Sequence, residues 1–334
     1  MESHHNIRLT SAEIASLWTT YMGDTMSRCV LSYLLNKVED TEIKPVAEYA
    51  LSITNKHIQT VTEIFNHENV PIPMGFTEKD VNVNAPRLFD DMFIIAYLRY
   101  MGRLGVASHS FAYPLTTRSD VHDFFKECIT SAAELEDQAR KVMLSKGLYV
   151  RPPYISTPEK VDFIKKQSFL TGWFGERRPL TAIEITHLYS NLQTNILGKS
   201  LIMGFSQVAK DDEVRDYFLR GRDISAKHYE IFSSVLSEEH IPVPTTWDHT
   251  VMDSTQAPFS DKLMMFHISG LNATGITNYG AAIASSPRRD LAPHYTRLST
   301  EILKYAEDGF NIMIDHGWME QPPQADDRDE LARR

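Results

Sequence analysis

Apolar residues recur every three or four positions near the beginning of the chain, which is the spacing of one face of an α-helix. The stripe consists of Ile14, Leu17, Trp18, Tyr21, Met22 and Met26. Thr10 and Glu13, directly before it, have the spacing of a capping box. We therefore predict a first helix that begins after Thr10 and ends at about Lys37.

Seven further helices are predicted from the same kinds of signal. Proline cannot continue a helix, so Val70-Pro71-Ile72-Pro73 ends the second one, and Gly147 is placed as the C-cap of the fourth. No alternating strand pattern competes with these helices, and the predicted fold class is all-α. The ranges are 40–69, 86–113 and 119–146, followed by 181–208, 212–240, 258–285 and 289–316.

The chain contains an internal duplication. A shift of 171 places 9–73 on 180–244, with 13 identities in 65 positions where chance gives about 4. After one deletion, at a shift of 170, Arg118 and Asp120 match Arg288 and Asp290. We predict two domains, at 9–153 and 180–323, a linker at 154–179 and a charged tail at 324–334.

The connections predict the topology of each half. The first two helices are joined by a few residues, as are the last two, so each pair is expected to be antiparallel. The middle connection, of about 17 residues, can cross a whole bundle. One such crossover gives the up-down-down-up order of ferritin-like four-helix bundles, and a plain up-down bundle with a long loop is the alternative.

The third helix of each half is rich in small residues, including Gly102 and Gly105 in one half and Gly270, Gly275 and Gly280 in the other. Glycine inside a helix costs about 1 kcal/mol relative to alanine, so a compensating gain is expected. Close packing of helices is the favoured explanation. A ligand that lies against bare backbone is the alternative.

Composition removes several classes of function. The net charge is -10 and the pI about 5.7, which does not indicate a nucleic-acid-binding protein. No segment predicts a membrane span, and the polar N-terminus does not resemble a signal peptide. We therefore expect a cytoplasmic protein. Cys29 and Cys128 are too few for a disulfide framework, and they form no zinc-type spacing with histidines.

The duplicated motifs resemble a known group of proteins. Tandem bundles that open with Leu-Thr-x-x-Glu-Ile, carry Lys-His in the second helix and end that helix with Pro-Ile-Pro are similar to an uncharacterised family of spore-forming bacteria, related to spore coat protein F. The resemblance covers about 9–323. It implies a ferritin-like four-helix fold and a link to sporulation, and it supplies no catalytic residues.

A ferritin-like fold raises the question of a di-metal site, which normally uses Glu-x-x-His on two helices. Within the predicted helices, this spacing occurs at Glu184 and His187, in a first turn, and the matching residues of the first half are Glu13 and Ser16. The usual ligand set is therefore incomplete. The cofactor stays unknown, and a metal is an open alternative.

One repeated pair, His57 and His228, lies in the middle of the second helix of each half. Asp24 and Asn195 are predicted at the same height on the first helices, so a hydrogen bond to each histidine would give each bundle a polar tie. A hydrogen-bonded core histidine is the favoured interpretation. A ligand-binding or proton-handling role and an exposed surface position are the alternatives.

Two functions follow from these observations. The favoured one is a non-catalytic structural or interaction protein that binds protein partners or itself, with Trp173, Phe174 and Trp318 near the bundle ends. The second is a metal- or small-ligand-binding ferritin-like enzyme with its site near His57 and His228. A weaker third is a small-molecule-binding protein that uses the gap between the bundles. The incomplete sets of metal ligands favour the first.

Overall fold

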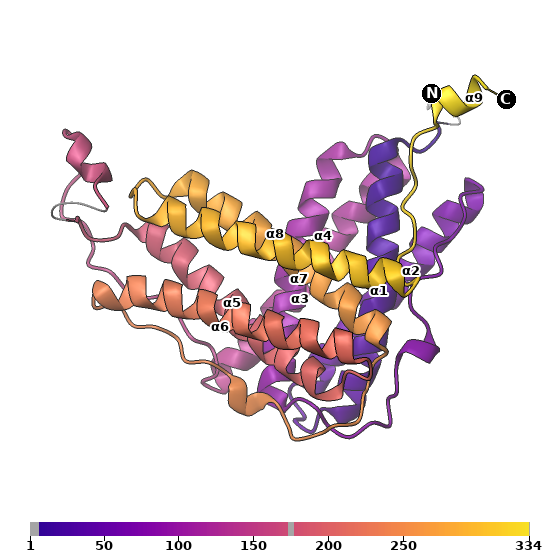
Figure 1. The fold of residues 1–334 in the computed structure, drawn as a ribbon, viewed down its shortest axis with the longest axis horizontal. Coiled ribbons are helices and arrows are strands. Elements are labelled where there is room, and N and C mark those ends of the chain that lie inside the picture. The colour runs from indigo at the N-terminus through magenta and orange to yellow at the C-terminus, as the bar shows by residue number, and fades with distance from the viewer. Residues whose placement is uncertain (1–6, 173–176, 334) are drawn as a thin grey trace. The chain divides into compact units, whose positions relative to one another are not determined.

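The computed structural model describes residues 7–172 and 177–333, and within these ranges it is helical, with one isolated β-bridge (Figure 1). By its internal contacts the chain divides into two units. The first comprises residues up to Asn84, Ile94–Met143 and Met319–Arg334, and the second comprises Ala85–Phe93 and Leu144–Trp318. Trp173 and Phe174, which we expected near a bundle end, lie outside the described residues.

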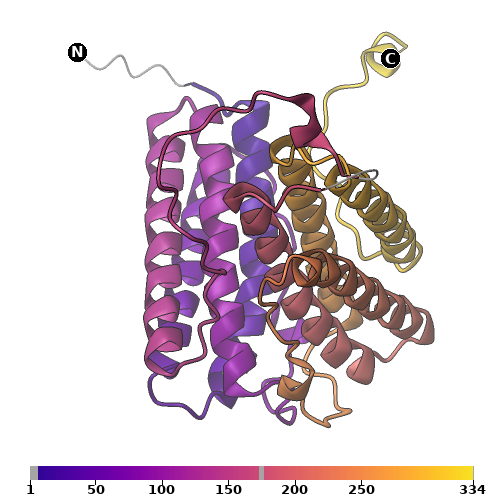
Figure 2. The ribbon, with the colours of Figure 1, turned by 90° about the vertical axis from the view of Figure 1, so that its left-hand side faces the viewer.

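The first unit is built on four long helices, which lie side by side in Figure 2. They are α1 (Ser11–Lys37), α2 (Lys44–His67), α3 (Asp91–Ala112) and α4 (Ser119–Ser145), with short 3-10 helices η1 (Glu78–Asp80) and η2 (Tyr113–Leu115) between them. The capping box at Thr10 is confirmed. The third helix begins at Asp91 rather than at 86, because Asp90 caps it by accepting from the Phe93 amide at 2.8 Å.

The second unit repeats this arrangement. Its long helices are α5 (Ala182–Val208), α6 (Asp212–Glu238), α7 (Asp261–Ser285) and α8 (Leu291–Asp315). The remaining short helices of the chain are η3 (Gln167–Leu170), η4 (Asp248–Thr250) and α9 (Arg328–Leu331). Thr181 and Glu184 form the second capping box. The predicted all-α fold in two tandem halves is therefore confirmed.

Side-chain contacts give the helix directions in the second unit. Arg220 pairs with Asp308 and Lys227 with Glu301, so α6 and α8 are antiparallel. Helices α7 and α8 are joined by a short connection, as are α5 and α6. Helices α6 and α7 therefore run parallel, which is the up-down-down-up order.

The first unit has the same order. Lys56 pairs with Glu127 and Glu68 with Arg118, which makes α2 and α4 antiparallel. Helices α3 and α4 are a hairpin, so α2 and α3 run parallel. The long connection between α2 and α3 allows this order, as the sequence predicted.

Each bundle is held by its own apolar core. One core cluster of the first unit contains Leu17, Val61, Ile64, Phe65, Ala112, Val121, Phe124, Phe125 and Cys128. A cluster of the second unit contains Leu180, Ile185, Leu188, Leu192, Phe232, Val235, Leu236, Tyr279, Ala282, Leu291, Tyr295, Leu298 and Ile302. Burial of such side chains contributes about 1.5–3 kcal/mol each, so these layers fix the positions of the polar groups between them.

A buried carboxylate joins two helix N-termini in the first unit. Besides capping α1, Glu13 Oε1 accepts from the amides of Thr117 and Arg118, at 2.7 and 2.9 Å, just before α4. Burial opposes ionisation of Glu13, but these amides and that of Thr10 stabilise its charge and lower its pKa to about 2. The Arg118 guanidinium pairs with Glu68, after α2, and with Asp120.

The second unit closes the corresponding network. Glu184 caps α5 and accepts from the backbone amide of Arg288 at 3.1 Å, and Arg288 pairs with Glu239 and Asp290. This network also includes the guanidinium of Arg178, which forms a bidentate pair with Glu184 at 2.7 and 2.8 Å. The charged residues that both halves share therefore stabilise one end of each bundle.

The small residues of α3 allow α4 to approach closely. A Cβ at Gly102 would lie 2.7 Å from the backbone nitrogen of Glu136, and one at Gly105 would lie 2.8 Å from Cβ of Ala132. The expected close packing is confirmed there. In α7, however, a Cβ at Gly270 or Gly280 would meet no described atom within 4 Å, so close packing does not explain those two glycines.

Among the described helices, none has the length and apolarity to cross a membrane.

Candidate functional site

His57 lies in the middle of α2 and is buried, with 6% of its surface exposed. Its Nδ1 lies 3.2 Å from Oδ2 of Asp24 on α1, the neighbour predicted from helix register. Its Nε2 lies 3.4 Å from Oγ of Ser131 on α4. The Asp24 oxygen is buried and has no well-aligned hydrogen-bond donor among the described residues, so the contact is a close polar approach rather than a well-formed hydrogen bond.

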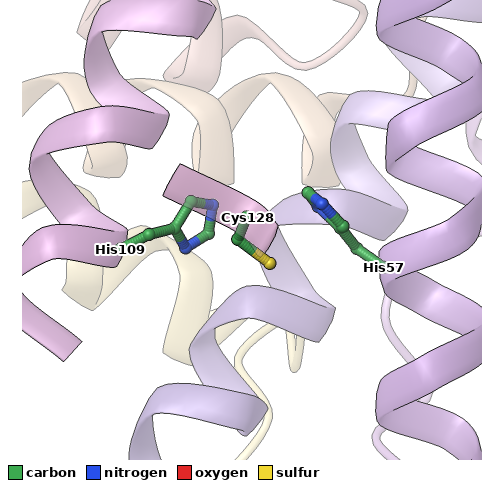
Figure 3. A group of neighbouring side chains, drawn as sticks. All are labelled: His57, His109 and Cys128. Carbon is green, nitrogen blue, oxygen red and sulfur yellow. The ribbon is translucent and has the colours of Figure 1, made fainter. Parts of the chain in front are cut away.

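Two further donors lie beside His57, and they come from the other two helices of the unit (Figure 3). They are His109 on α3 and Cys128 on α4, and one potential ligand atom from each of these residues and from His57 lies within 4.8 Å of the other two. The imidazole rings of His57 and His109 are 5.8 Å apart, edge to face. The cluster therefore brings together the nitrogen and sulfur ligands that transition metals prefer.

Burial keeps His109 and Cys128 uncharged. It lowers the pKa of His109 to about 4 and raises the pKa of the Cys128 thiol well above its usual range. Cys128 is fully buried and is a free cysteine. At neutral pH an uncharged imidazole and an uncharged thiol thus share the interior with the Asp24 carboxylate.

Sequence reasoning did not find His109 and Cys128. They belong to different helices and have no zinc-type spacing, and the comparison of the two halves selected residues that are shared, which these are not. The signal that the sequence offers is the alignment of the two halves, because His109 and Tyr279 lie equally far from Asp90 and Ser260, the residues that cap α3 and α7. This alignment pairs the two residues, but it does not give their height relative to the repeated histidines.

The second unit places a different chain of polar groups at this height. His228 Nδ1 lies 2.9 Å from the hydroxyl of Tyr279, which accepts a hydrogen bond from Asn195 Nδ2 at 3.0 Å. The structure thus connects Asn195 and His228, but through the tyrosine rather than by the direct bond that we expected. Because its hydroxyl accepts from Asn195, Tyr279 can donate to the histidine.

The other nitrogen of His228 faces a carboxylate. Its Nε2 lies 3.1 Å from Oε2 of Glu301 on α8, and Lys227 binds the same carboxylate at 2.7 and 2.9 Å. Burial lowers the pKa of His228, although Glu301 opposes that shift. At neutral pH the residue is therefore a neutral imidazole that accepts from Tyr279 and donates to Glu301.

A small cavity of about 50 Å³ adjoins this chain inside the second bundle. Asn195, His228 and Tyr279 line it together with Asn272 and Tyr305, and apolar residues complete the wall. A space of this size holds a few water molecules or a very small ligand. It lies at the position where a bundle of this topology can carry a buried site.

The other candidates from the sequence have structural partners. Both oxygens of Glu184 bind arginine and backbone groups, so the Glu184–His187 pair offers no free carboxylate. A second potential ligand group, at Asp211, Glu213 and His316, lies near the surface, where acidic groups are common without an ion. Asp211 already caps α6.

Comparison with known proteins gives family membership but no activity. No curated protein sequence matches the chain significantly. Among solved structures, that of a protein from Bacillus halodurans C-125, described as a "putative spore coat protein", matches 45% of this chain and 98% of its own, with 18% identity and a TM-score of 0.42. Residues 2–161 and 168–331 each match the family described as "Protein of unknown function (DUF3231)". These two matches confirm the duplication, and because they cover nearly the whole chain, the protein belongs to the DUF3231 family.

Proposed function

We propose that the protein is a non-catalytic structural or interaction protein, which acts by binding protein chains, its own copies included. The observation that carries the proposal is a set of exposed apolar side chains between the two family repeats and at their edges. Each member is more than half exposed: Tyr154, Ile155, Val161, Phe163 and Ile164. Clusters of large exposed apolar residues are typical of surfaces that bind partners.

The segment that carries these residues lacks regular secondary structure from Val150 to Lys165. The backbone N–H and C=O groups of this segment are therefore not engaged in helical hydrogen bonds. A partner can supply both apolar contacts and backbone hydrogen bonds. The charged residues that the halves share at the bundle ends also support the proposal. Arg118 pairs with Glu68 and Arg288 with Glu239, so these residues have structural partners.

The proposal also covers the place of action. The motifs that resemble the coat-protein-F group favour a spore-associated protein, and a cytoplasmic location is the alternative. This part is tested by a fluorescent fusion expressed during sporulation. Accumulation at the spore surface is the expected result, and even distribution in the cell throughout sporulation would contradict it.

Binding by the exposed segment is tested by self-association. The five apolar residues are replaced by serine, and molar mass is measured by light scattering over a range of concentrations. The wild-type mass is expected to rise with concentration, while the variant stays monomeric. Leu303→Ser, which removes one exposed apolar residue from α8, is the matched control and should behave as wild type. Identical, concentration-independent masses for all three proteins would contradict self-binding through this segment.

A second candidate function rests on the cavity beside His228. Its mixture of polar groups and apolar wall is the usual lining of a small-molecule site. Native mass spectrometry of protein purified under mild conditions tests this function. A bound small molecule that is lost in Ile202→Trp, which fills the cavity, would support it. A mass equal to that of the bare chain would favour the structural function.

A further inference from the structure

Three strong metal donors meet inside the first bundle, and each comes from a different helix (Figure 3). We propose that His57, His109 and Cys128 bind one zinc ion, which fastens α2, α3 and α4 to one another. This inference goes beyond the proposed function, because it assigns a ligand to the interior of the first unit. It does not depend on the exposed segment.

The donor set and its spacing suit zinc. Zinc binds imidazole nitrogen at about 2.0–2.1 Å and thiolate sulfur at about 2.3 Å, so two nitrogens and one sulfur at tetrahedral positions lie about 3.3–3.6 Å apart. The three donor atoms lie within 4.8 Å of one another. Closure therefore requires a contraction of about 1 Å, which is within the range of side-chain adjustment.

Asp24 supplies the support that a zinc-bound histidine normally has. Such a histidine usually faces a carboxylate with its second nitrogen, and Asp24 Oδ2 lies 3.2 Å from Nδ1 of His57. This leaves Nε2 of His57 for the metal. When zinc binds, the Cys128 thiol releases its proton to solvent, and the resulting thiolate and the carboxylate together neutralise the divalent ion. A buried site without net charge avoids most of the cost of removing charge from water.

Packing alone does not explain His109 and Cys128. The second unit builds the same layer with Tyr279 at the height of His109 and with Leu298 at the position that aligns with Cys128. Both residues are buried in its apolar core. The bundle can thus be filled at this level without a metal ligand, so two added donors beside an existing histidine indicate a binding role in the first unit.

Cobalt titration of the full chain tests the site, because cobalt replaces zinc and is coloured. The protein is purified without a histidine tag, stripped with a chelator and titrated with Co²⁺ alone. One equivalent should produce the visible bands of tetrahedral cobalt and a near-ultraviolet thiolate-to-cobalt band, and one equivalent of Zn²⁺ should abolish both. Absence of these bands would overturn the proposal.

Variants distinguish this site from others in the chain. Cys128→Ser should lose the thiolate band, and His109→Gln should weaken cobalt binding by roughly 100-fold or more, since loss even of a supporting group costs 10- to 100-fold. Asp24→Asn should weaken it by about 10- to 100-fold. Cys29→Ser and His228→Gln are the matched controls, and both should bind as wild type. Circular dichroism of each metal-free variant verifies folding.

Three results would contradict the assignment. Unchanged cobalt spectra in a folded Cys128→Ser variant would show that the thiol is not a ligand. Strong binding of copper at the same residues without measurable affinity for zinc would overturn the choice of metal, since two imidazoles and a thiolate also suit copper. Equal weakening by His228→Gln and His109→Gln would place the metal elsewhere.

Discussion

The two bundles share their ends and differ in their middle. At the ends, the pairs Arg118–Glu68 and Arg288–Glu239 are the same contact made twice. In the middle, the repeated histidine has different neighbours in each copy. They are Asp24, His109, Cys128 and Ser131 in the first unit, and Asn195, Tyr279, Leu298 and Glu301 in the second.

The acid partner of the histidine changes helix between the copies. In the first unit it is Asp24 on α1, which faces Nδ1 of His57. In the second it is Glu301 on α8, which faces Nε2 of His228. Each histidine has one carboxylate neighbour, which limits the cost of burying its ring. The other side chains around the ring differ between the two units. One copy has metal donors there and the other has a tyrosine and a cavity.

The comparison teaches that residues shared by duplicated halves report mainly on the fold. The residues that differ are the better guide to function, because stability does not fix them. Four measurements can break or sharpen this comparison, and they follow from the largest expected effect to the smallest.

Removal of the arginine at each bundle end should affect the second unit more. Arg288 is fully buried, and Asp290 has 3% exposed surface. Within the described ranges, Arg288→Met would leave the Asp290 carboxylate paired with Arg177 alone, at 3.7 Å. The expected loss is about 3–5 kcal/mol, against about 1 kcal/mol for Arg118→Met, because Asp120 is half exposed. Calorimetric unfolding of the full chain measures both. Equal losses would show that the two networks are energetically alike.

The capping glutamates should make both units sensitive to acid. Burial opposes ionisation of Glu184, but Arg178 and Thr181 stabilise its charge and lower its pKa to about 2. A carboxylate with a lowered pKa stabilises the fold above its usual pKa of about 4.5, and this contribution, of about 3 kcal/mol, is lost as the pH falls from about 4.5 to 2.

Glu184→Gln and Glu13→Gln test this acid sensitivity by unfolding at pH 7 and pH 3. Each variant should be less stable at pH 7 and should show a smaller loss between the two values than wild type. Similar effects are expected for both, since Glu13 also has a pKa of about 2 without an arginine partner. An unchanged pH dependence in either variant would contradict the structural role of that carboxylate.

Loss of the Tyr279 hydroxyl should cost about 1–3 kcal/mol, because Asn195 and His228 would each lose a buried partner. Urea unfolding of Tyr279→Phe measures this cost. Tyr154→Phe, at a position with 85% exposure, is the control and should change stability by less than about 0.5 kcal/mol. A neutral Tyr279→Phe would show that the polar chain does not stabilise the second bundle.

The cavity of the second unit should tolerate a small addition. A Cβ at Gly198 would have its nearest neighbour, Oγ of Ser225, at 3.9 Å, so Gly198→Ala should stabilise the helix by about 0.5–1 kcal/mol. Gly221→Ala, at the same cavity, should destabilise it, because the new Cβ would collide with the hydroxyl of Tyr305. Melting temperatures compare the two. A destabilising Gly198→Ala would indicate that the space is filled.

Helix boundaries were predictable from the sequence because they depend on local signals. The helix starts follow from the capping boxes at Thr10 and Thr181, and the end of α2 follows from the prolines after it. Each of these signals involves residues only a few positions apart in the sequence. Topology followed from connection lengths. The third helix was predicted five residues too early, because it begins after its cap at Asp90 rather than at Pro86.

The site was only partly predictable. The pairing of Asp24 with His57 followed from the register of a helix hairpin. The register of α3 against α2 could not be obtained in this way, because a long connection separates them and does not fix their relative height. His109 and Tyr279 were missed for that reason, and Cys128 was set aside because its counterpart is a leucine.

The zinc content of the intact chain tests the central claim, that the two units differ in their middle layer, most directly. Elemental mass spectrometry is applied to tag-free protein after dialysis against zinc, for wild type and for the double variant His109→Tyr/Cys128→Leu, which gives the first unit the residues of the second. The account predicts one zinc per wild-type chain and none in a folded double variant. No zinc in the wild type, or one zinc retained in the variant, would contradict it.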